Sequence, residues 1–110
     1  MERYINNIDY KKAVSLKDLI PIKDISALSL VDRKSLAIKI ISADKNMNIP
    51  PHSSTGDVLV FMLEGKAEIT IEEEKSELMF GESILIPANA MHSLKASEAF
   101  KILVIQVKAE

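Results

Sequence analysis

The chain has 110 residues, a formal net charge of −2 and no cysteine. Its length is that of a single domain, and its charge offers no cationic surface to nucleic acid or to an anionic membrane. The lack of cysteine excludes disulfides, thiolate metal ligands and a cysteine nucleophile. The N-terminal residues lack the apolar core of a signal peptide, and the longest uninterrupted apolar run, Val58 to Leu63, is far too short to span a bilayer. We therefore expect a soluble cytoplasmic protein that binds neither nucleic acid nor membrane.

The first 24 residues are predicted to form a peripheral N-terminal extension (1–24) to a domain that spans residues 25–110. Ser15 and Asp18 are spaced to cap a single helical turn, which Pro21 would end. A short extended segment along the edge of the domain is also compatible with this sequence. Both interpretations place the extension outside the main core.

From residue 25 onward the sequence favours strands. A short apolar run at 27–31 is followed by a polar turn and by the β-branched run 35–43. In the second run, period-two alternation gives one face with Leu36, Ile38 and Ile40 and another with Ala37, Lys39 and Ile41. The segment 44–51 contains Asp, Asn and two prolines, and we interpret it as a loop.

The strand predicted at 58–63 is apolar on both faces. Val58, Val60 and Met62 point one way, and Leu59, Phe61 and Leu63 point the other. Such a strand is either central in a sandwich or covered by a partner subunit. With Ala37 and Ile41, its second face predicts a covered outer surface. A homodimer is the preferred cover, and the N-terminal segment is the other candidate.

Five further short strands are predicted in the second half of the chain. Turns at Gly65 and Gly81 and a charged hairpin tip at 72–75 separate them. They span residues 66–72, 76–80, 84–86, 91–95 and 100–107. Together the predicted elements make about eight short strands with almost no helix, which is typical of an all-β barrel or jelly roll.

The two histidines of the chain each lie in a stretch that combines a proline loop, a strand and a glycine. The first stretch contains Pro51-His52 and ends at Gly65, and the second contains Gly81, Pro87 and His92. In these motifs the sequence resembles a small single-domain cupin over residues 35–107. The resemblance implies an all-β fold, the cupin-type double-stranded β-helix or jelly-roll barrel. It also implies that both histidines face the barrel interior near its mouth.

The metal motif is degenerate. A typical cupin holds its metal with three histidines and a glutamate, and the resemblance carries over two of these positions, His52 and His92. Ser54 stands in the place of the second histidine and Val58 in the place of the glutamate. The nearest carboxylate, Asp57, precedes Val58, so alternation aims it at the opposite face. Two imidazoles fall below the donor number usual for zinc or non-haem iron.

Three functional hypotheses follow from this pocket. The first is a binding or sensing module that holds a small polar ligand, such as a small acid or carbonyl compound, without a strong metal site. Its polar groups would be His52, Ser54 and His92, and its apolar wall would include Val58, Val60, Met62, Leu36 and Ile38.

The second hypothesis is a metal-dependent enzyme of the dioxygenase or isomerase type, with a divalent transition metal on His52 and His92. The third is a partner-dependent module whose pocket is vestigial. No residue resembles an activated nucleophile, so the sequence assigns no catalytic residue and leaves open whether the protein is an enzyme.

Overall fold

The computed structural model describes residues 2–109, which form nine strands and one short 3-10 helix. The elements are η1 (Leu16–Asp18), β1 (Ile25–Asp32), β2 (Leu36–Ala43), β3 (Asn48–His52), β4 (Asp57–Glu64), β5 (Lys66–Ile71), β6 (Glu74–Met79), β7 (Ser83–Ile86), β8 (His92–Ala96) and β9 (Phe100–Val107). No helix in this range is long and apolar enough to cross a membrane.

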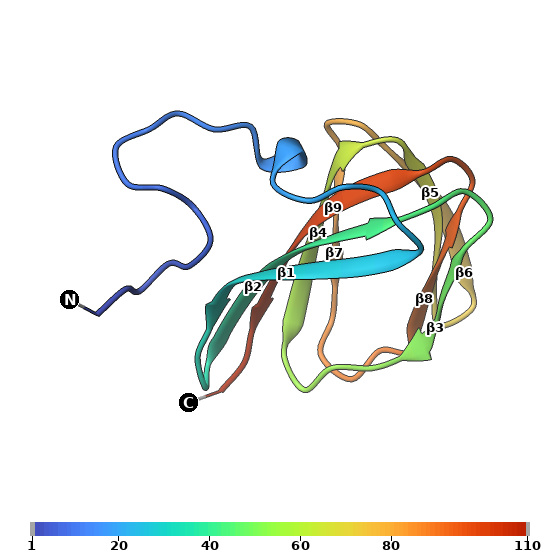
Figure 1. Cartoon of the computed structure of the whole chain (residues 1–110). Coiled ribbons are helices and arrows are strands. Elements are labelled where there is room, and N and C mark those ends of the chain that lie inside the picture. The colour runs from blue at the N-terminus through green and yellow to red at the C-terminus, as the bar shows by residue number, and fades with distance from the viewer. Residues whose placement is uncertain (1, 110) are drawn as a thin grey trace.

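The strands form two sheets that face each other (Figure 1). The five-stranded sheet has the order β1-β2-β9-β4-β7, and the four-stranded sheet has the order β3-β8-β5-β6. All strand pairs within them are antiparallel. The all-β jelly-roll fold expected from the sequence is thereby confirmed.

The main core lies between the two sheets. Its largest fully buried side chains include Phe100, Met62 and Ile102 from the five-stranded sheet and Ile69 from the four-stranded sheet. Along β4 and β9, every second residue points into this core, as the pleat of a strand requires. The inner rows are set by cross-strand pairs such as Met62 with Ile102.

The glycine that ends β4 permits the turn into β5. Gly65 has φ +85°, a left-handed conformation that costs other residues more than glycine. A Cβ at this position would also collide with the backbone carbonyl of Ala99. The closing glycine of the first motif is therefore required by the local geometry of this turn.

The segment 44–51 was expected to be a loop, and this prediction was wrong from residue 48 onward. The structure places β3 there, paired with β8 at the edge of the four-stranded sheet. An edge strand tolerates proline, which cannot donate to the sheet. The pairing shifts register between Ile49 and His52, the interval that contains both prolines.

The sequence interpretation also exchanged the inward and outward faces of β2. Lys39 and Ile41 point inward, because they pair with Val104 and Ile102 on the inner face of β9. Ile38 instead packs in a second cluster on the outer face of the sheet. Both faces of β2 are apolar, so alternation could not tell which one lines the barrel.

The N-terminal segment covers part of that outer face. Of the two alternatives, the short helical turn is correct: η1 spans Leu16–Asp18, although the Ser15 side chain makes no capping bond. Ile20 packs against Leu30 and Ile40 of the five-stranded sheet. The buried Lys101 donates from Nζ to the backbone carbonyl of Lys17, and this bond holds the turn against β9.

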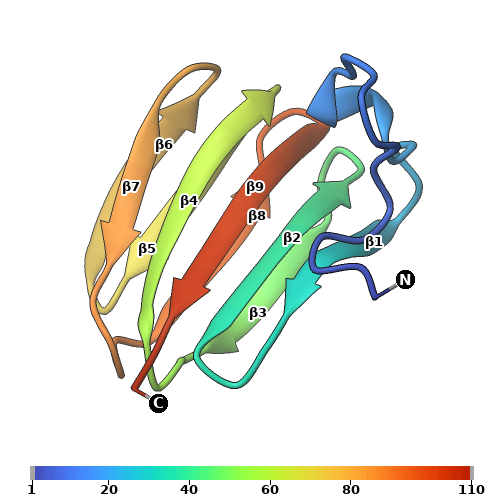
Figure 2. The same cartoon turned by 90° about the vertical axis from the view of Figure 1, so that its left-hand side faces the viewer.

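An uncovered part of the outer face remains near β4 and β7. We call the cross-strand series Leu85, Leu59, Ile105 and Ile38 the outer row, because its members pair directly from β7 to β2. Figure 2 shows the five-stranded sheet with the N-terminal segment beside β1 and away from β7. Leu85 is 63% exposed and Leu59 is 37% exposed. The apolar face predicted for β4 is thus only partly covered within one chain.

Candidate functional site

The structure brings the two histidines together. His52 ends β3, His92 begins β8, and the two residues are directly paired across these strands. Their ring centroids are 4.2 Å apart, with the ring planes tilted by 59°. His92 is buried, whereas His52 is exposed on the edge strand. Two residues that lie 40 positions apart in the sequence thus form one polar pair.

Backbone carbonyls orient both rings in the same way. Nδ1 of His52 lies 2.9 Å from the carbonyl oxygen of Pro50, and Nδ1 of His92 lies 3.0 Å from that of Ala90. A carbonyl oxygen accepts hydrogen bonds but cannot donate them, so Nδ1 carries the proton in each ring. The Nε2 atom of each histidine is left for another partner.

The pair lines a cavity of about 470 Å³ between the two sheets. Its other lining residues are mainly apolar along the sheets and polar at the loop that follows β3: Lys39, Ile41, Ile49, Ser53, Ser54, Thr55, Val58, Val60, Leu94, Ile102, Val104 and Gln106. The cavity therefore has an apolar wall and a small group of polar side chains, as small-molecule sites usually do.

Five of the six residues predicted for the pocket line this cavity: His52, Ser54, Val58, Val60 and His92. Met62 does not. It is fully buried farther along β4, where it packs in the main core between the sheets. Leu36 and Ile38, which the sequence also suggested for the wall, do not line it either, since the inner face of β2 carries Lys39 and Ile41.

Ser54 is held in a local hydrogen-bond network. Its hydroxyl accepts a bond from the Gly56 N–H at 3.2 Å and a second bond from the side-chain amide of Gln106. Its own backbone carbonyl accepts a bond from the Asn89 N–H at 2.6 Å. With both acceptor positions of the hydroxyl used, the hydroxyl proton of Ser54 is left to donate.

Sequence reasoning assigned to the pocket none of four further polar residues that line it: Lys39, Ser53, Thr55 and Gln106. Of these, Lys39 and Gln106 each interrupt an otherwise apolar inner row, at the pairs Lys39 with Val104 and Gln106 with Val58. A polar residue at an inward position of an apolar strand was the signal that could have found them. It was not decisive, because the inward face of β2 was not known.

The titratable groups that line the cavity are all basic. Lys39, His52 and His92 are the titratable residues among its described lining, and no carboxylate is present. Asp57 points elsewhere, as alternation predicted, because its Oδ1 accepts a bond from the Ala88 N–H at 2.9 Å. The site therefore favours a ligand with an anionic or hydrogen-bond-accepting group.

The donor set does not fit a tightly held metal. The two Nε2 atoms are suitable ligands, and carbonyl bonds to Nδ1 are common behind metal-binding imidazoles. However, within residues 2–109 no group of three His, Cys, Asp or Glu side chains is placed to hold an ion. Catalytic zinc normally has three protein ligands, and non-haem iron adds a carboxylate to two histidines.

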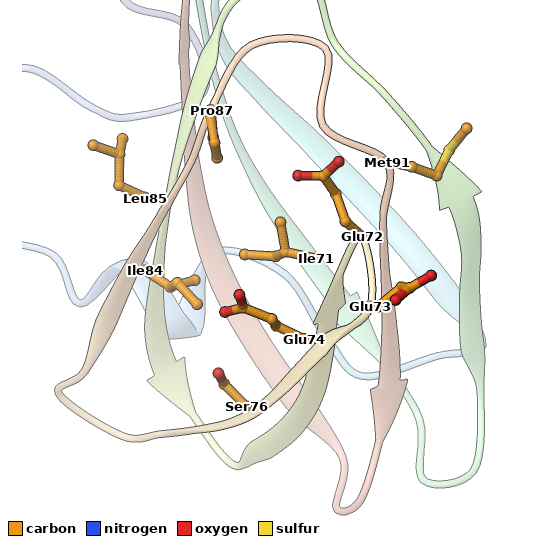
Figure 3. Close-up of a pocket in the computed structure, with 9 residues that line it drawn as sticks. All are labelled: Ile71, Glu72, Glu73, Glu74, Ser76, Ile84, Leu85, Pro87 and Met91. Atoms are coloured by element: carbon orange, nitrogen blue, oxygen red, sulfur yellow. The ribbon is translucent and has the colours of Figure 1, made fainter.

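A second, larger groove of about 910 Å³ lies at the opposite edge of the barrel, between the β5–β6 turn and β7 (Figure 3). Glu72 and Glu73 come from the turn and Glu74 begins β6, while Ile84 and Leu85 come from β7. The groove is lined by acceptors and apolar groups without a histidine, lysine or arginine. We therefore regard the histidine cavity as the candidate site, because it lies between the two sheets and combines an apolar wall with several converging polar groups.

Comparison with known proteins gives one family. The model of the cupin domain matches residues 42–106. A conserved protein of unknown function from Streptococcus pyogenes is 40% identical over 99% of this chain and 97% of its own, with a TM-score of 0.96. A cupin superfamily protein from Desulfitobacterium hafniense is 22% identical over 96% and 98%, with a TM-score of 0.91. A cupin 2 conserved barrel domain protein from Leptotrichia buccalis is 31% identical over 84% of this chain and 46% of its own, with a TM-score of 0.82. No curated protein matches the chain.

Proposed function

The chain belongs to the cupin domain family, and from this premise we propose that it binds a small carboxylic acid inside its barrel. The carboxyl group lies at His52, His92 and Ser54, and the apolar body lies along the valine wall, which is formed by Val58, Val60 and Val104. The observation that carries the proposal is the pair of imidazoles with free Nε2 atoms at the polar end of an apolar cavity.

The polar end suits a carboxyl group in either protonation state. A neutral imidazole with its Nδ1 proton committed presents a lone pair at Nε2, which accepts a bond from a carboxylic acid. A protonated imidazole presents an N–H at the same atom, which donates to a carboxylate. The Ser54 hydroxyl proton and the Lys39 ammonium add two more donors.

The apolar wall of the cavity suits a short hydrocarbon chain. Val58, Val60 and Val104 form an apolar surface that removes such a chain from water. A volume of about 470 Å³ lies in the range of small-molecule sites. Hexanoate, a carboxylate with a short unbranched chain, is therefore a suitable first probe.

The alternative is a metal-dependent cupin enzyme. The observation that favours it is the carbonyl bond behind each imidazole, which sets the tautomer that a metal ligand needs. When bound, a divalent metal would supply Lewis acidity at His52 and His92. Two histidine ligands are too few to hold a metal tightly, so we rank this alternative second.

Calorimetric titration of the full chain with hexanoate, with and without a chelator, separates the two readings. We expect hexanoate to bind with and without EDTA. Affinity should fall about tenfold or more in His92→Ala, which removes one charge-assisted or neutral hydrogen bond and its ring contacts. Ser93→Ala is the matched control, because Ser93 is the next residue on β8 and does not line the cavity.

Two outcomes would overturn the proposal. Hexanoate binding that EDTA abolishes and added zinc restores would favour the metal-dependent alternative. No binding of hexanoate at about 10 mM, together with a His92→Ala effect on stability alone, would favour a partner-dependent module with a vestigial pocket.

We further propose that a second copy of the chain covers the exposed end of the outer row. Exposed apolar residues that are contiguous across strands mark interaction surfaces, and a two-fold axis lets one uncharged patch face itself. Sedimentation should give a dimer for the native chain and a monomer for Leu85→Lys. Met79→Lys, at a similarly exposed position on the other sheet, is the control. A native monomer at about 50 µM would remove this proposal.

A further inference from the structure

A smaller cavity of about 330 Å³ adjoins the histidine cavity. The two cavities share Lys39 and Gln106, which line both of them. The smaller one extends to the turn between β1 and β2, where Arg33 lies, and to Lys108 after β9. We call Arg33, Lys39 and Lys108 with the space they line the basic annex. A ligand in the histidine cavity therefore has a neighbouring space that begins at its own wall.

The basic annex carries an excess of positive charge. Its three cations line the space with a single carboxylate, that of Asp32. Within the described range, none of these three cations takes part in a salt bridge, whereas four other lysines of the chain do. The chain as a whole has a net charge of −2. The charge of the annex is thus positive although the net charge of the molecule is negative, and no salt bridge of the described residues neutralises its three cations.

The backbone around the annex is fixed by hydrogen bonds. Arg33 and Leu36 close the β1–β2 turn with reciprocal backbone bonds of 2.8 and 3.3 Å. The Lys108 N–H donates to the carbonyl of Ser35 at 3.0 Å, which fastens the end of β9 to the same turn. The Arg33 guanidinium also lies 5.2 Å from the ring centroid of Tyr4. Arg33 and Lys108 therefore lie in one ordered corner of the fold, and Lys39 lines the same space from within β2.

We propose that the basic annex binds a second anionic group of the ligand, either a carboxylate or a phosphate. This inference rests on the proposed function, because the first carboxyl group lies at the histidine pair. The ligand is then an elongated dianion whose apolar middle crosses the valine wall. Lys39 lies where the two cavities meet and contributes to both ends, while Arg33 and Lys108 select for the second charge.

The test compares diacids with monoacids of the same chain length by calorimetric titration. The probes are adipate against hexanoate, suberate against octanoate, and 6-phosphonohexanoate for the phosphate-like case. We expect at least one dianion to bind about tenfold more tightly than its monoacid, the gain from one charge-assisted hydrogen bond. The gain should shrink as salt is raised toward about 1 M, because exposed charges are screened.

The double variant Arg33→Gln/Lys108→Gln should bring the ratio of dianion to monoacid affinity close to one. Lys45→Gln removes the same kind of charge from a residue that lines neither cavity, and it should keep the ratio. A phosphonate preference would identify a phosphate as the second group, and a diacid preference would identify a carboxylate.

The failures of the two proposals are distinguishable. If hexanoate binds but every dianion matches its monoacid, the basic annex is overturned and the proposed function stands. If the dianion advantage persists in the double variant, the second charge is bound elsewhere and the annex is again overturned. If no acid binds, the proposed function fails and the inference that rests on it fails too.

Discussion

The two ends of the barrel interior differ although the same sheets build them. At one end Met62, Ile69 and Phe100 are fully buried and fill the space between the sheets. At the other end the inner rows carry the shorter Val60 and Val104, and the interior opens into the histidine cavity. We call these the packed end and the open end.

The two ends separate stability from binding within one small domain. Dense packing stabilises the packed end, because each buried side chain keeps its full set of contacts. The open end gives up part of that contact and contains polar groups that would be costly in a closed core. Substitutions at the packed end should therefore mainly lower stability, whereas substitutions at the open end should mainly weaken hexanoate binding.

The largest effect on stability is expected from Met62→Ala at the packed end. Removing a fully buried side chain of this size costs about 2–5 kcal/mol, because a cavity remains that the neighbours cannot close. Urea unfolding would measure the loss, and hexanoate titration of the folded variant should still show binding. A loss below about 1 kcal/mol would mean that the packed end is not packed as described.

Adding volume should also separate the two ends. Ala67→Val at the packed end should cost about 1–3 kcal/mol, because Ala67 is fully buried in the main core, where added volume forces its neighbours to shift. Val104→Ile at the open end adds the same kind of group to a cavity wall, and it should change stability by less than about 1 kcal/mol while weakening hexanoate binding. If thermal unfolding shows the same loss of stability for both variants, the two ends do not differ in packing.

Within the polar pair, the buried histidine should matter more for stability than the exposed one. His92→Ala removes a buried ring and its bond to a backbone carbonyl, which should cost about 1–3 kcal/mol. His52→Ala should cost less than about 1 kcal/mol, because His52 is exposed on an edge strand. Chemical denaturation of both variants would check the order, and an equal loss would contradict it.

The smallest stability effect belongs to Gln106→Leu at the open end. The change removes a donor to the Ser54 hydroxyl but places an apolar side chain beside Val58, its partner on β4, so we expect a change within about 1 kcal/mol. Hexanoate binding should weaken more than stability does, because Ser54 loses the partner that orients it. Unchanged binding would show that Ser54 is not positioned by this amide.

The fold was predictable because the sequence marks it locally. Gly65 and Gly81 end their segments with positive φ, and the β-branched runs between the turns alternate as strands. The resemblance placed His52 and His92 together, which spacing along the chain does not do. The strand β3 was missed, because its two prolines are a loop signal everywhere except at a sheet edge.

The rest of the site depended on which face of β2 points inward, and the sequence alone does not determine this. Both faces of β2 are apolar, so the inward direction of Lys39 and Ile41 is set by pairing with β9. Met62 shares the inner face of β4 with the two valines of the cavity, but the cavity ends before it. Alternation predicts which side of a sheet a residue faces, while the extent of a cavity follows from side-chain volumes on both sheets.

The most direct test of the proposed function is a histidine-ring NMR titration of the full chain with hexanoate. We predict that the Nε2 signals of His52 and His92 shift together along one saturation curve, while the Nδ1 atoms keep their protons against the backbone carbonyls. If both rings stay unchanged while hexanoate shifts signals elsewhere, such as the acidic groove by Glu72, the carboxyl group is not held by the paired imidazoles.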